Sequence, residues 1–363
     1  MPILPGATIG ILGGGQLGRM LALAAAPLGY KVHVFAPEGE AVAVDVAAGE
    51  TRADYADEAA LAAFAGRCDV ITYEFENVPS ASVAFLEALK PVRPGPKALD
   101  VAQDRLSEKQ FVEALGGRTA PFRAVETLAE LETALAELGT PAILKTRRFG
   151  YDGKGQARIA TPVDAPEAFA SLGGKGLILE GFVRFEAEFS ILVARSPLGR
   201  EVHYPACLNE HEDGILTRTT VPAAGIDPAH VDAATALVVR IADALDYVGV
   251  LACEFFATPA GPLFNEMAPR VHNSGHWSIE GAATSQFEQH VRAICGLPLG
   301  PVDLTAPLVE MLNLLGDTSA EWARILADPT AHLHLYGKAD AVPGRKMGHV
   351  TRLLQAPSDG PWL

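Results

Sequence analysis

The chain has 363 residues, of which 49% are hydrophobic, and a mean hydropathy of +0.17. This length suits two or three domains and supplies enough apolar material for substantial cores. A net charge of −15 and a pI near 5.1 exclude nonspecific nucleic-acid binding as the main activity, because that activity requires a basic surface that displaces counterions. Any phosphate site must therefore be locally basic within an acidic protein.

The sequence predicts a cytoplasmic protein that does not enter a membrane. The amino-terminal residues lack a basic stretch and are interrupted by Pro and Gly, and no apolar run approaches the length that spans a bilayer. The four cysteines are scattered without a C-x-x-C pair, which fits neither a zinc site nor a disulfide framework. We expect these thiols to be reduced and buried.

Residues 8–29 read as a strand, a glycine turn and a helix. The turn has the pattern G-x-G-x-x-G at 13–18, which can bring backbone amides against a phosphate. The next strand, 31–35, ends in Ala36 and Pro37, where a dinucleotide site would have a ribose-binding acid, so the indication of a dinucleotide is weak. Glycines that merely permit tight strand and helix packing remain the alternative.

Helices and strands continue to alternate up to residue 96, which predicts a small parallel sheet. A strand over 69–73 delivers Glu74 and Glu76 at its carboxyl end, where open parallel sheets bind ligands. Either acid could reach a substrate, although solvated loop acids are the commoner case. A P-G-P segment at 94–96 then marks a predicted domain boundary.

A single charged helix is predicted over 98–115, and it carries Arg105. The second domain begins near residue 121 and contains an apolar strand that ends in Lys145. A lysine that closes an apolar strand seldom lacks an anionic partner, so we expect one for Lys145. The alternative is an ammonium group that reaches solvent along its aliphatic stem.

The run T-R-R-F-G-Y-D-G-K-G-Q at 146–156 reads as a flexible phosphate-binding lid. Its three glycines let backbone amides approach oxyanions, and its basic residues supply charge of the right sign. It is not a Walker loop, because G-x-x-x-x-G-K-[ST] is absent. A plain hairpin with a glycine tip remains possible.

A strand over 177–183 is predicted to offer its backbone to a purine edge, with Glu180 accepting from the exocyclic amine. Glu188 follows at a distance suited to ribose hydroxyls. His211 lies in a predicted turn, where a surface histidine and a ligand contact are equally compatible with the pattern. Acidic residues are common on edge strands, so spacing alone does not decide these roles.

The most informative stretch is a predicted hairpin over 251–267, in which apolar runs flank proline and glycine turn formers. Counting outward from Ala260 places Glu254 opposite Glu266. Residues on facing strand positions have Cβ atoms about 5 Å apart, so two carboxylates there repel unless a cation lies between them. Oxygen ligands, with the amide of Asn265 nearby, favour Mg²⁺ or Mn²⁺ over zinc. Two solvated carboxylates on an edge hairpin are the alternative.

Anion-binding groups crowd the next positions, and a guanidinium among them matches a planar carboxylate or carbonate. This stretch is therefore predicted to hold a metal, a phosphate and a small oxyanion together. A second basic cluster in the carboxyl-terminal tail is a candidate site for a phosphorylated substrate, with a solvated basic loop as the alternative. The first group is Arg270, His272, Asn273, Ser274 and His276, and the second is Lys338, Arg345, Lys346 and His349.

Together these motifs resemble those of ATP-grasp enzymes, and specifically the 5-(carboxyamino)imidazole ribonucleotide synthetases of purine biosynthesis. The resemblance covers nearly the full chain and rests on G-G-G-Q-L-G-R-M, D-R-L-x-x-K, F-G-Y-D-G-K-G-Q, N-E-M-A-P-R-V-H-N-S-G-H-W and P-G-R-K-M-G-H, of which the last three together are highly specific. It implies an α/β and α+β fold of three parts: a Rossmann-like domain over 1–96, an ATP-grasp domain over 97–300 with a lid at about 117–182, and a small carboxyl-terminal domain over 301–363.

The resemblance also implies the site residues. Glu254 and Glu266 would hold Mg²⁺ or Mn²⁺, and Arg270, Lys145 and Asp152 would act in catalysis, Asp152 by managing the proton of the amine. Bicarbonate would be bound by Arg270, His272, Asn273 and Ser274. The aminoimidazole ribonucleotide would contact Glu74, Tyr151, Asp152, Lys338 and Arg345, with Gly15, Gln16 and Leu17 near its phosphate. ATP would contact Arg105, Lys145, Gly150, Tyr151, Asp152, Gly153, Lys154, Gly155, Gln156, Glu180, Gly181, Phe182, Val183, Glu188, His211, Asn265 and Glu266.

The implied reaction is the ATP- and bicarbonate-dependent carboxylation of the exocyclic amine of 5-aminoimidazole ribonucleotide through carboxyphosphate, and the family implies a homodimer. A formate-dependent glycinamide ribonucleotide transformylase or a biotin carboxylase would share the ATP residues, but the tail motif argues against both. A nicotinamide dehydrogenase or a nonenzymatic nucleotide sensor would account for the glycine turn. The missing acid after the second strand argues against the dehydrogenase, and the paired glutamates argue against the sensor.

Overall fold

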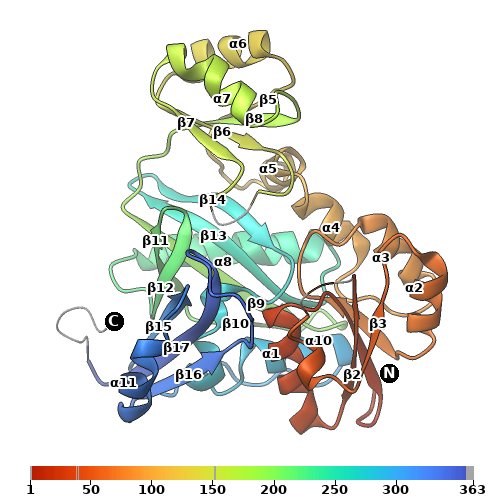
Figure 1. Ribbon diagram of the computed structural model, residues 1–363. Helices are drawn as coiled ribbons and strands as arrows, with labels where there is room; N and C mark the ends of the chain where they lie inside the picture. Colours follow the sequence, from red (N-terminus) through yellow and green to blue (C-terminus); the bar gives the residue numbers. More distant parts are fainter. Residues whose placement is uncertain (1, 38, 40, 151–152, 357–363) are drawn as a thin grey trace.

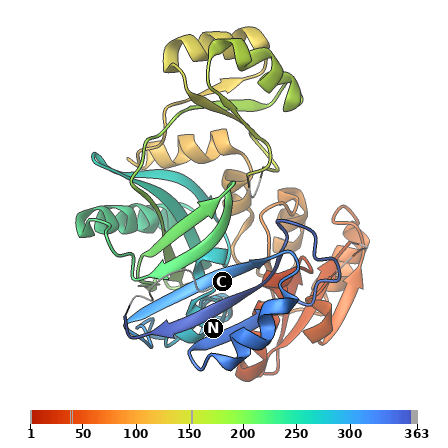
Figure 2. The same cartoon turned by 60° about the vertical axis from the view of Figure 1, so that its left-hand side comes forward.

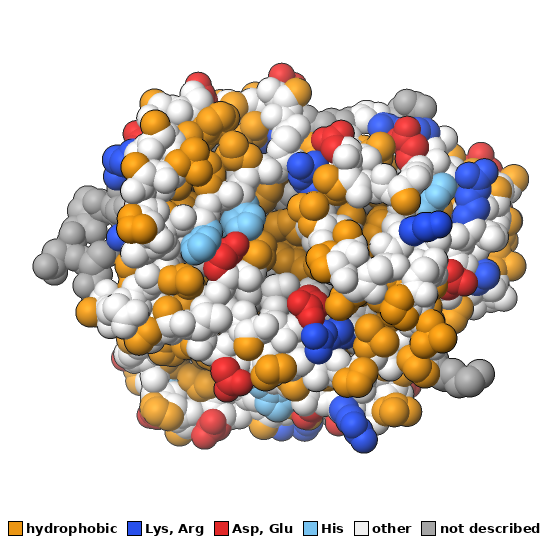
Figure 3. Space-filling view, turned by 90° about the horizontal axis from the view of Figure 1, so that it is seen from below, with side chains coloured by type: hydrophobic (Ala, Val, Ile, Leu, Met, Phe, Trp, Pro, Cys, Tyr) orange, Lys and Arg blue, Asp and Glu red, His pale blue; other side chains and the backbone are white. Residues whose placement is uncertain are grey.

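The computed structural model describes residues 2–37, 39, 41–150 and 153–356, and within these residues the strands form three sheets. Figure 1 shows the small lid sheet at the top, the large sheet in the body and the amino-terminal sheet beside it. None of the helices in this part of the chain combines the length and the apolar character needed to cross a bilayer. On the face seen from below, Lys and Arg side chains are interspersed with Asp and Glu (Figure 3).

The amino-terminal sheet is parallel, in the order β3-β2-β1-β4, as the β-α-β alternation predicted. Its central strands are almost wholly buried, which is the pattern of parallel strands that are covered on both faces. The carboxyl end of β4 lies next to the glycine turn that follows β1. The elements are β1 (Thr8–Leu12), α1 (Gln16–Ala25), β2 (Lys31–Ala36), β3 (Gly49–Arg52), α2 (Glu58–Ala65), β4 (Val70–Tyr73) and α3 (Ser80–Glu87).

The predicted single helix over 98–115 is wrong, because the structure has two helices, α4 (Pro96–Ala102) and α5 (Arg105–Ala114). Asp104 has extended backbone angles, and its carboxylate accepts from the backbone N–H groups of Leu106 and Ser107. An aspartate stabilises a helix at this capping position and destabilises it in the interior, so α5 starts anew at Arg105. The change of direction turns the first residues of α5 toward the site.

The lid contains a four-stranded antiparallel sheet in the order β5-β8-β6-β7, and two helices pack on the face turned away from the body (Figure 1). Its small core is formed by residues such as Leu131, Leu144 and Leu179. Strand β8 ends at residue 181, two residues before the predicted end, so Phe182 and Val183 leave the sheet. The elements are β5 (Phe122–Val125), α6 (Leu128–Leu138), β6 (Ala142–Thr146), β7 (Gln156–Ile159), α7 (Ala165–Ser171) and β8 (Leu177–Gly181).

The large sheet has nine strands, and its carboxyl-terminal strands continue the same sheet by pairing β15 with β12 (Figure 2). Helix α8 packs on β9, β13 and β14 through its apolar face. The elements are β9 (Ala187–Arg195), β10 (Glu201–His203), β11 (Cys207–Glu212), β12 (Ile215–Val221), α8 (Pro228–Ala244), β13 (Gly249–Thr258), β14 (Gly261–Ala268), α9 (Ser278–Gly281), α10 (Gln286–Cys295), β15 (Leu308–Leu315), α11 (Trp322–Ala327), β16 (Ala331–Leu335) and β17 (Lys346–Leu354).

One hydrophobic core joins the amino-terminal domain to the large sheet. It contains Leu21 from α1, Val291 from α10, Met311 from β15 and the fully buried Trp277. The Trp277 ring meets Tyr204 edge-on at 6.1 Å, and its indole N–H donates to the sulfur of Cys207 at 3.2 Å. The predicted burial of all four cysteines as free thiols is confirmed. Packing at this core therefore fixes the amino-terminal domain against the strands that carry the site.

We predict that Trp277→Ala lowers the free energy of unfolding by about 3–5 kcal/mol, because it opens a cavity where the two parts of the protein meet. Urea denaturation measures this loss. Trp322→Ala is the matched control, since that side chain is 38% exposed and its removal should cost much less. Equal losses in the two variants would contradict the role assigned to this core.

Candidate active site

Two cavities meet at the centre of the molecule. The first, about 380 Å³, lies between the amino-terminal domain and the large sheet, and we call it the domain cavity. The second, about 350 Å³, lies between the lid and the large sheet, and we call it the lid cavity. Arg105, Glu254 and Glu266 line both cavities, so a group held by these residues contacts the contents of each.

The β13–β14 hairpin sets Glu254 directly opposite Glu266, as predicted. Thr258 pairs with Gly261, which places the turn half a residue earlier than the count from Ala260 assumed. A bulge then shifts the register, because Asn265 is an additional residue between the partners of positions 254 and 255. Without the bulge, Glu266 would pair with the neighbour of Glu254 and point to the opposite face of the sheet.

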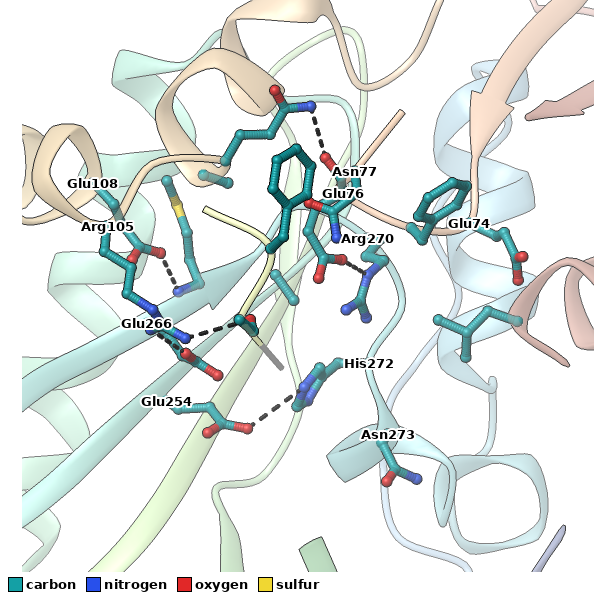
Figure 4. Close-up of a pocket in the computed structure, with 18 of the residues that line it drawn as sticks. Glu74, Glu76, Asn77, Arg105, Glu108, Glu254, Glu266, Arg270, His272 and Asn273 are labelled. Atoms are coloured by element: carbon teal, nitrogen blue, oxygen red, sulfur yellow. Dashed lines mark hydrogen bonds and ion pairs between the residues drawn. The ribbon is translucent and has the colours of Figure 1, made fainter. Parts of the chain in front are cut away.

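The two carboxylates have different surroundings. Glu266 accepts from Nη1 of Arg105 at 2.8 Å, whereas Oε1 of Glu254 lies 3.5 Å from Nε2 of His272 (Figure 4). Burial and the neighbouring Glu266 raise the pKa of Glu254. Burial acts in the same direction on Glu266, but Arg105 and Lys145 outweigh it and lower the pKa of that carboxyl. Glu254 therefore keeps excess negative potential that a further cation would neutralise.

This donor set fits Mg²⁺ or Mn²⁺. Two facing carboxylates and the adjoining amide of Asn265 supply hard oxygen ligands, which these ions prefer. Over the described ranges, no group of three or more His, Cys, Asp or Glu side chains forms an all-protein metal site. Two protein carboxylates suit an ion that completes its shell with phosphate oxygens and water.

Lys145 has the anionic partner that was predicted for it. Its Nζ lies 2.9 Å from Oε2 of Glu180, and Nζ of the buried Lys109 lies 3.3 Å from Oε1 of the same carboxylate. Burial raises the pKa of Glu180, but the two lysines outweigh that effect and lower it to about 2. Both Glu180 oxygens face ammonium groups, so the prediction that this side chain accepts from a purine amine does not fit. The backbone at 181–183 is left to face a base.

The outer wall of the lid cavity combines aromatic rings with polar groups. Phe185 stacks on Phe256 at 4.6 Å between ring centroids, and the guanidinium of Arg158 lies 5.0 Å from the ring of Phe182. On the inner wall, Nδ1 of His211 lies 3.0 Å from Glu188. Flat apolar surfaces beside a few polar groups suit a heteroaromatic base attached to a hydroxylated sugar.

The domain cavity presents a guanidinium and a neutral imidazole side by side (Figure 4). Nε of Arg270 donates to Glu76, and burial together with the positive charges of Arg270 and Lys346 lowers the pKa of His272 to about 3. Ser274 is fully buried, and its hydroxyl lies 2.9 Å from Nδ1 of His272. Ser274 thus orients the imidazole from behind and does not line the cavity.

Glu74 occupies the glycine turn that was predicted to approach a phosphate. Its carboxylate accepts from the backbone N–H of Gly15 and, at 2.9 Å, from that of Gly18. Gln16, Leu17 and Glu74 line the domain cavity, but the Gly15 amide points to the carboxylate. This geometry argues against a phosphate contact at Gly15 and, equally, against a dinucleotide on this turn, because one anion already fills it.

Comparison with known proteins gives the family. Family models match residues 6–103 (ribonucleotide synthetase preATP-grasp domain), 110–287 (ATP-grasp domain) and 310–358 (phosphoribosylaminoimidazole carboxylase C-terminal domain). The N5-carboxyaminoimidazole ribonucleotide synthase of Brucella melitensis is 50% identical over 96% of this chain and 97% of that protein, and the enzyme of that name from Pseudomonas aeruginosa is 48% identical over 94% and 93%.

Solved structures agree. The N5-carboxyaminoimidazole ribonucleotide synthetase of Thermus thermophilus superposes with a TM-score of 0.90 at 50% identity, over 96% of this chain and 94% of that one. The chain belongs to the N5-carboxyaminoimidazole ribonucleotide synthase family. An Aspergillus clavatus synthase of this family, in complex with ADP and 5-aminoimidazole ribonucleotide, has a TM-score of 0.89 at 31% identity, over 96% and 94% of the chains. The predicted family, ATP-grasp fold and ATP-dependent ligase class are thus confirmed.

Within this synthase, the predicted residues divide between the two cavities. Gly150 and the predicted substrate residues Gln16, Leu17, Glu74, Arg270, His272 and Asn273 line the domain cavity. Gly155 lines neither cavity, and Tyr151 and Asp152 lie outside the described residues. The lid cavity is lined by the other predicted ATP residues: Arg105, Lys145, Gly153, Lys154, Gln156, Glu180, Gly181, Phe182, Val183, Glu188, His211, Asn265 and Glu266.

In the basic tail cluster, Lys346 lines the domain cavity, whereas the predicted Lys338 and Arg345 do not. Nζ of Lys338 donates to the carbonyl of Lys346 at 2.8 Å, and Nη1 of Arg345 donates to the carbonyl of Asp340 at 2.9 Å. These two residues therefore shape the segment that presents Lys346. The adjacent basic residues in P-G-R-K-M indicated a basic segment, but the sequence does not show which of the two side chains faces inward.

Sequence reasoning also missed Glu108, a carboxyl buried beside the facing pair Glu254 and Glu266. Its Oε1 accepts from the backbone N–H of Met267 at 2.6 Å, and burial together with Glu266 raises its pKa to about 8. One sequence signal was present, since positions 105 and 108 lie on one face of a helix. Its use required knowing that this face packs on β14.

We predict that Glu180→Gln lowers the free energy of unfolding by about 3–5 kcal/mol, because it leaves two buried lysines without their counter-charge. The lowered pKa of Glu180 also makes its contribution to the free energy of unfolding depend on pH. This contribution is complete above the pKa of Glu180 in the unfolded chain and is lost as the pH falls toward about 2. Urea denaturation at pH 7 and pH 4 measures both effects, and the variant should show the weaker pH dependence.

Glu137→Gln is the control, because the Glu137–Arg123 pair is about half exposed and should contribute little. Similar losses in the two variants would refute the importance of the buried cluster.

Proposed function

We propose that this synthase uses ATP and bicarbonate to carboxylate the exocyclic amine of 5-aminoimidazole ribonucleotide, giving 5-(carboxyamino)imidazole ribonucleotide, ADP and phosphate. The observation that carries the proposal is the opposed pair Glu254 and Glu266 where the two cavities meet. A terminal phosphoryl group held there lies between a nucleotide in the lid cavity and an acceptor in the domain cavity. The names and bound ligands of the relatives support the same assignment.

ATP binds in the lid cavity. Its base lies against Phe182, Phe185 and the backbone that follows β8, where donors and acceptors are no longer used by the sheet. Glu188 is placed for the ribose hydroxyls. Lys145 and the backbone amides of Gly153, Lys154 and Gln156, which line this cavity, hold the phosphates, so their negative charge lies toward Arg105. Phosphoryl transfer depends on such positioning and charge neutralisation more than on covalent help from the protein.

Bicarbonate lies in the domain cavity on Arg270, with His272 and Asn273 beside it. One of its oxygens attacks the terminal phosphorus of ATP, the bond to the bridging oxygen of ADP breaks, and carboxyphosphate forms. The neutral His272 can exchange hydrogen bonds with this anion without adding charge. Mg²⁺ or Mn²⁺ bound by Glu254 and Glu266 would neutralise the charge on the phosphates during this transfer.

The exocyclic amine of the ribonucleotide then attacks the carboxyl carbon as the bond to phosphate breaks, and the amine loses a proton. Asp152 is proposed to manage that proton. The ribonucleotide lies on Gln16, Leu17 and Glu74, and its phosphate lies toward Lys346 and the tail segment. The lid loop excludes water, which would otherwise hydrolyse carboxyphosphate. A homodimer and a cytoplasmic location are further proposals, the first from the family and the second from the reduced, buried thiols.

The proposed function predicts that ADP release by the purified enzyme requires both bicarbonate and 5-aminoimidazole ribonucleotide, with one carboxylated product for each ADP. A coupled ADP assay that leaves out bicarbonate or the ribonucleotide in turn measures the two requirements, and incorporation of labelled bicarbonate measures the ratio of carboxylated product to ADP. Formate-dependent or biotin-dependent turnover, or full turnover without bicarbonate, would contradict the proposal.

Removal of one metal-facing charge should abolish ADP formation. Glu254→Gln or Glu266→Gln leaves the side-chain shape but weakens cation binding, so we expect the rate to fall by at least about a hundredfold. The ADP assay over a Mg²⁺ titration measures the effect. Glu132→Gln, on the exposed face of α6, should keep the native rate. Native turnover in either site variant would remove the metal assignment.

A further inference from the structure

The loop after β4, residues 74–79, reaches from the amino-terminal domain to the guanidinium of Arg270. Glu76 in this loop accepts from Nε of Arg270, and the two side chains are 24% and 16% exposed. Figure 4 shows the pair facing each other above Glu254 and Glu266, on the wall of the domain cavity. The sequence interpretation offered Glu76 only as an alternative to Glu74 for substrate contact, and the proposed mechanism gives it no role.

We propose that Glu76 is a positioning residue, which fixes the plane of the Arg270 guanidinium so that its outer edge faces bicarbonate. This inference rests on the proposed function, in which Arg270 holds that anion. A guanidinium has five N–H donors in a rigid plane. Glu76 takes the Nε donor, and the carbonyl of Val271 takes one from Nη1 at 3.1 Å. Because Nε–H and Nη1 lie on different sides of the guanidinium, these two contacts set its plane, and among the described residues no protein acceptor takes the Nη2 donors, which are left for an anion in the cavity.

The position of Glu76 is itself fixed by Gln103, at the junction between α4 and α5. Nε2 of Gln103 donates to the carbonyls of Glu76 at 2.8 Å and of Val78 at 2.6 Å. Its Oε1 accepts from Arg148 at 2.6 Å, at the base of the lid loop. Gln103 is 6% exposed, so these hydrogen bonds are shielded from competing water. The loop therefore cannot shift without breaking its hydrogen bonds to Gln103, which is itself held by Arg148 at the base of the lid loop.

Charge supports the assignment. The Glu76 carboxylate compensates the charge of Arg270 in a cavity wall that also contains Lys346. Burial raises the pKa of Glu76, but Arg270 outweighs this effect and lowers the pKa. A buried ion pair adds little net stability compared with apolar packing of the same volume. Stability alone is thus a weak reason for a carboxylate at this position, whereas orientation of an anion-binding guanidinium requires a directional acceptor.

Three variants test the inference by steady-state kinetics. Glu76→Ala removes the acceptor, so the KM for bicarbonate should rise roughly tenfold to a hundredfold, the effect of losing a hydrogen bond to a charged group. The KM for ATP should stay at the native value, because ATP lies in the other cavity. Glu76→Gln retains an oxygen for Nε and should recover most of the bicarbonate affinity. More ADP should also form per carboxylated product in the alanine variant, since misplaced carboxyphosphate is hydrolysed.

A native bicarbonate KM in Glu76→Ala, or equal rises in the KM values for bicarbonate and ATP, would overturn the inference. If the alanine variant does not fold, Glu76→Asp decides, because it withdraws the carboxylate by one methylene and must raise the bicarbonate KM. An unchanged KM in that variant would also overturn it. The native enzyme separates failure of this inference from failure of the proposed function. If the proposed function is wrong, the native enzyme shows no ADP release that depends on bicarbonate and the ribonucleotide.

Discussion

The repulsion between two facing carboxylates is the constraint on which this structure depends. Glu254 and Glu266 are held opposite each other by hairpin register, and only one of them has a close guanidinium partner. The remaining negative potential lies where the domain cavity and the lid cavity meet. In the proposed function, a cation that relieves this potential also contacts the phosphate oxygens of ATP, so binding and chemistry share a single electrostatic origin.

Three consecutive residues at the junction of α4 and α5 connect the base of the lid loop to the facing carboxylates. Gln103 contacts Arg148, Asp104 makes a bidentate pair with Arg147 at 2.7–3.1 Å, and Arg105 reaches Glu266. The backbone N–H of Arg105 also donates to the carbonyl of Arg147 at 2.9 Å. The base of the lid loop is thereby tied to the same short segment that orients Glu266 and, through Gln103, the loop that carries Glu76.

Local patterns in the sequence predicted the hairpin, the parallel sheet and the presence of an anionic partner for Lys145, because each depends on residues close in the chain or on a burial rule. The contacts that were missed are long-range. Glu74 fills the glycine turn from 56 or more positions away, and Glu180 meets lysines from two other elements. Asp104 could have been recognised as a helix start from its capping preference, but its pairing with Arg147 depends on tertiary structure. No feature of the sequence indicated the bulge at Asn265. The bulge offsets the error in the assumed position of the turn, so the predicted pairing of Glu254 with Glu266 is still correct.

The shared sheet has a consequence for how this polypeptide can be divided. Strand β15 pairs along β12, and β17 pairs along β15, so the last strands complete hydrogen bonds of the central domain. A protein that stopped after α10 would leave the backbone of β12 as an unpaired edge, open to pairing with other chains. The carboxyl-terminal strands thus act as a protective border against aggregation as well as the support for Lys346. Splitting the molecule at that point into separately produced fragments should yield insoluble material unless both are made together.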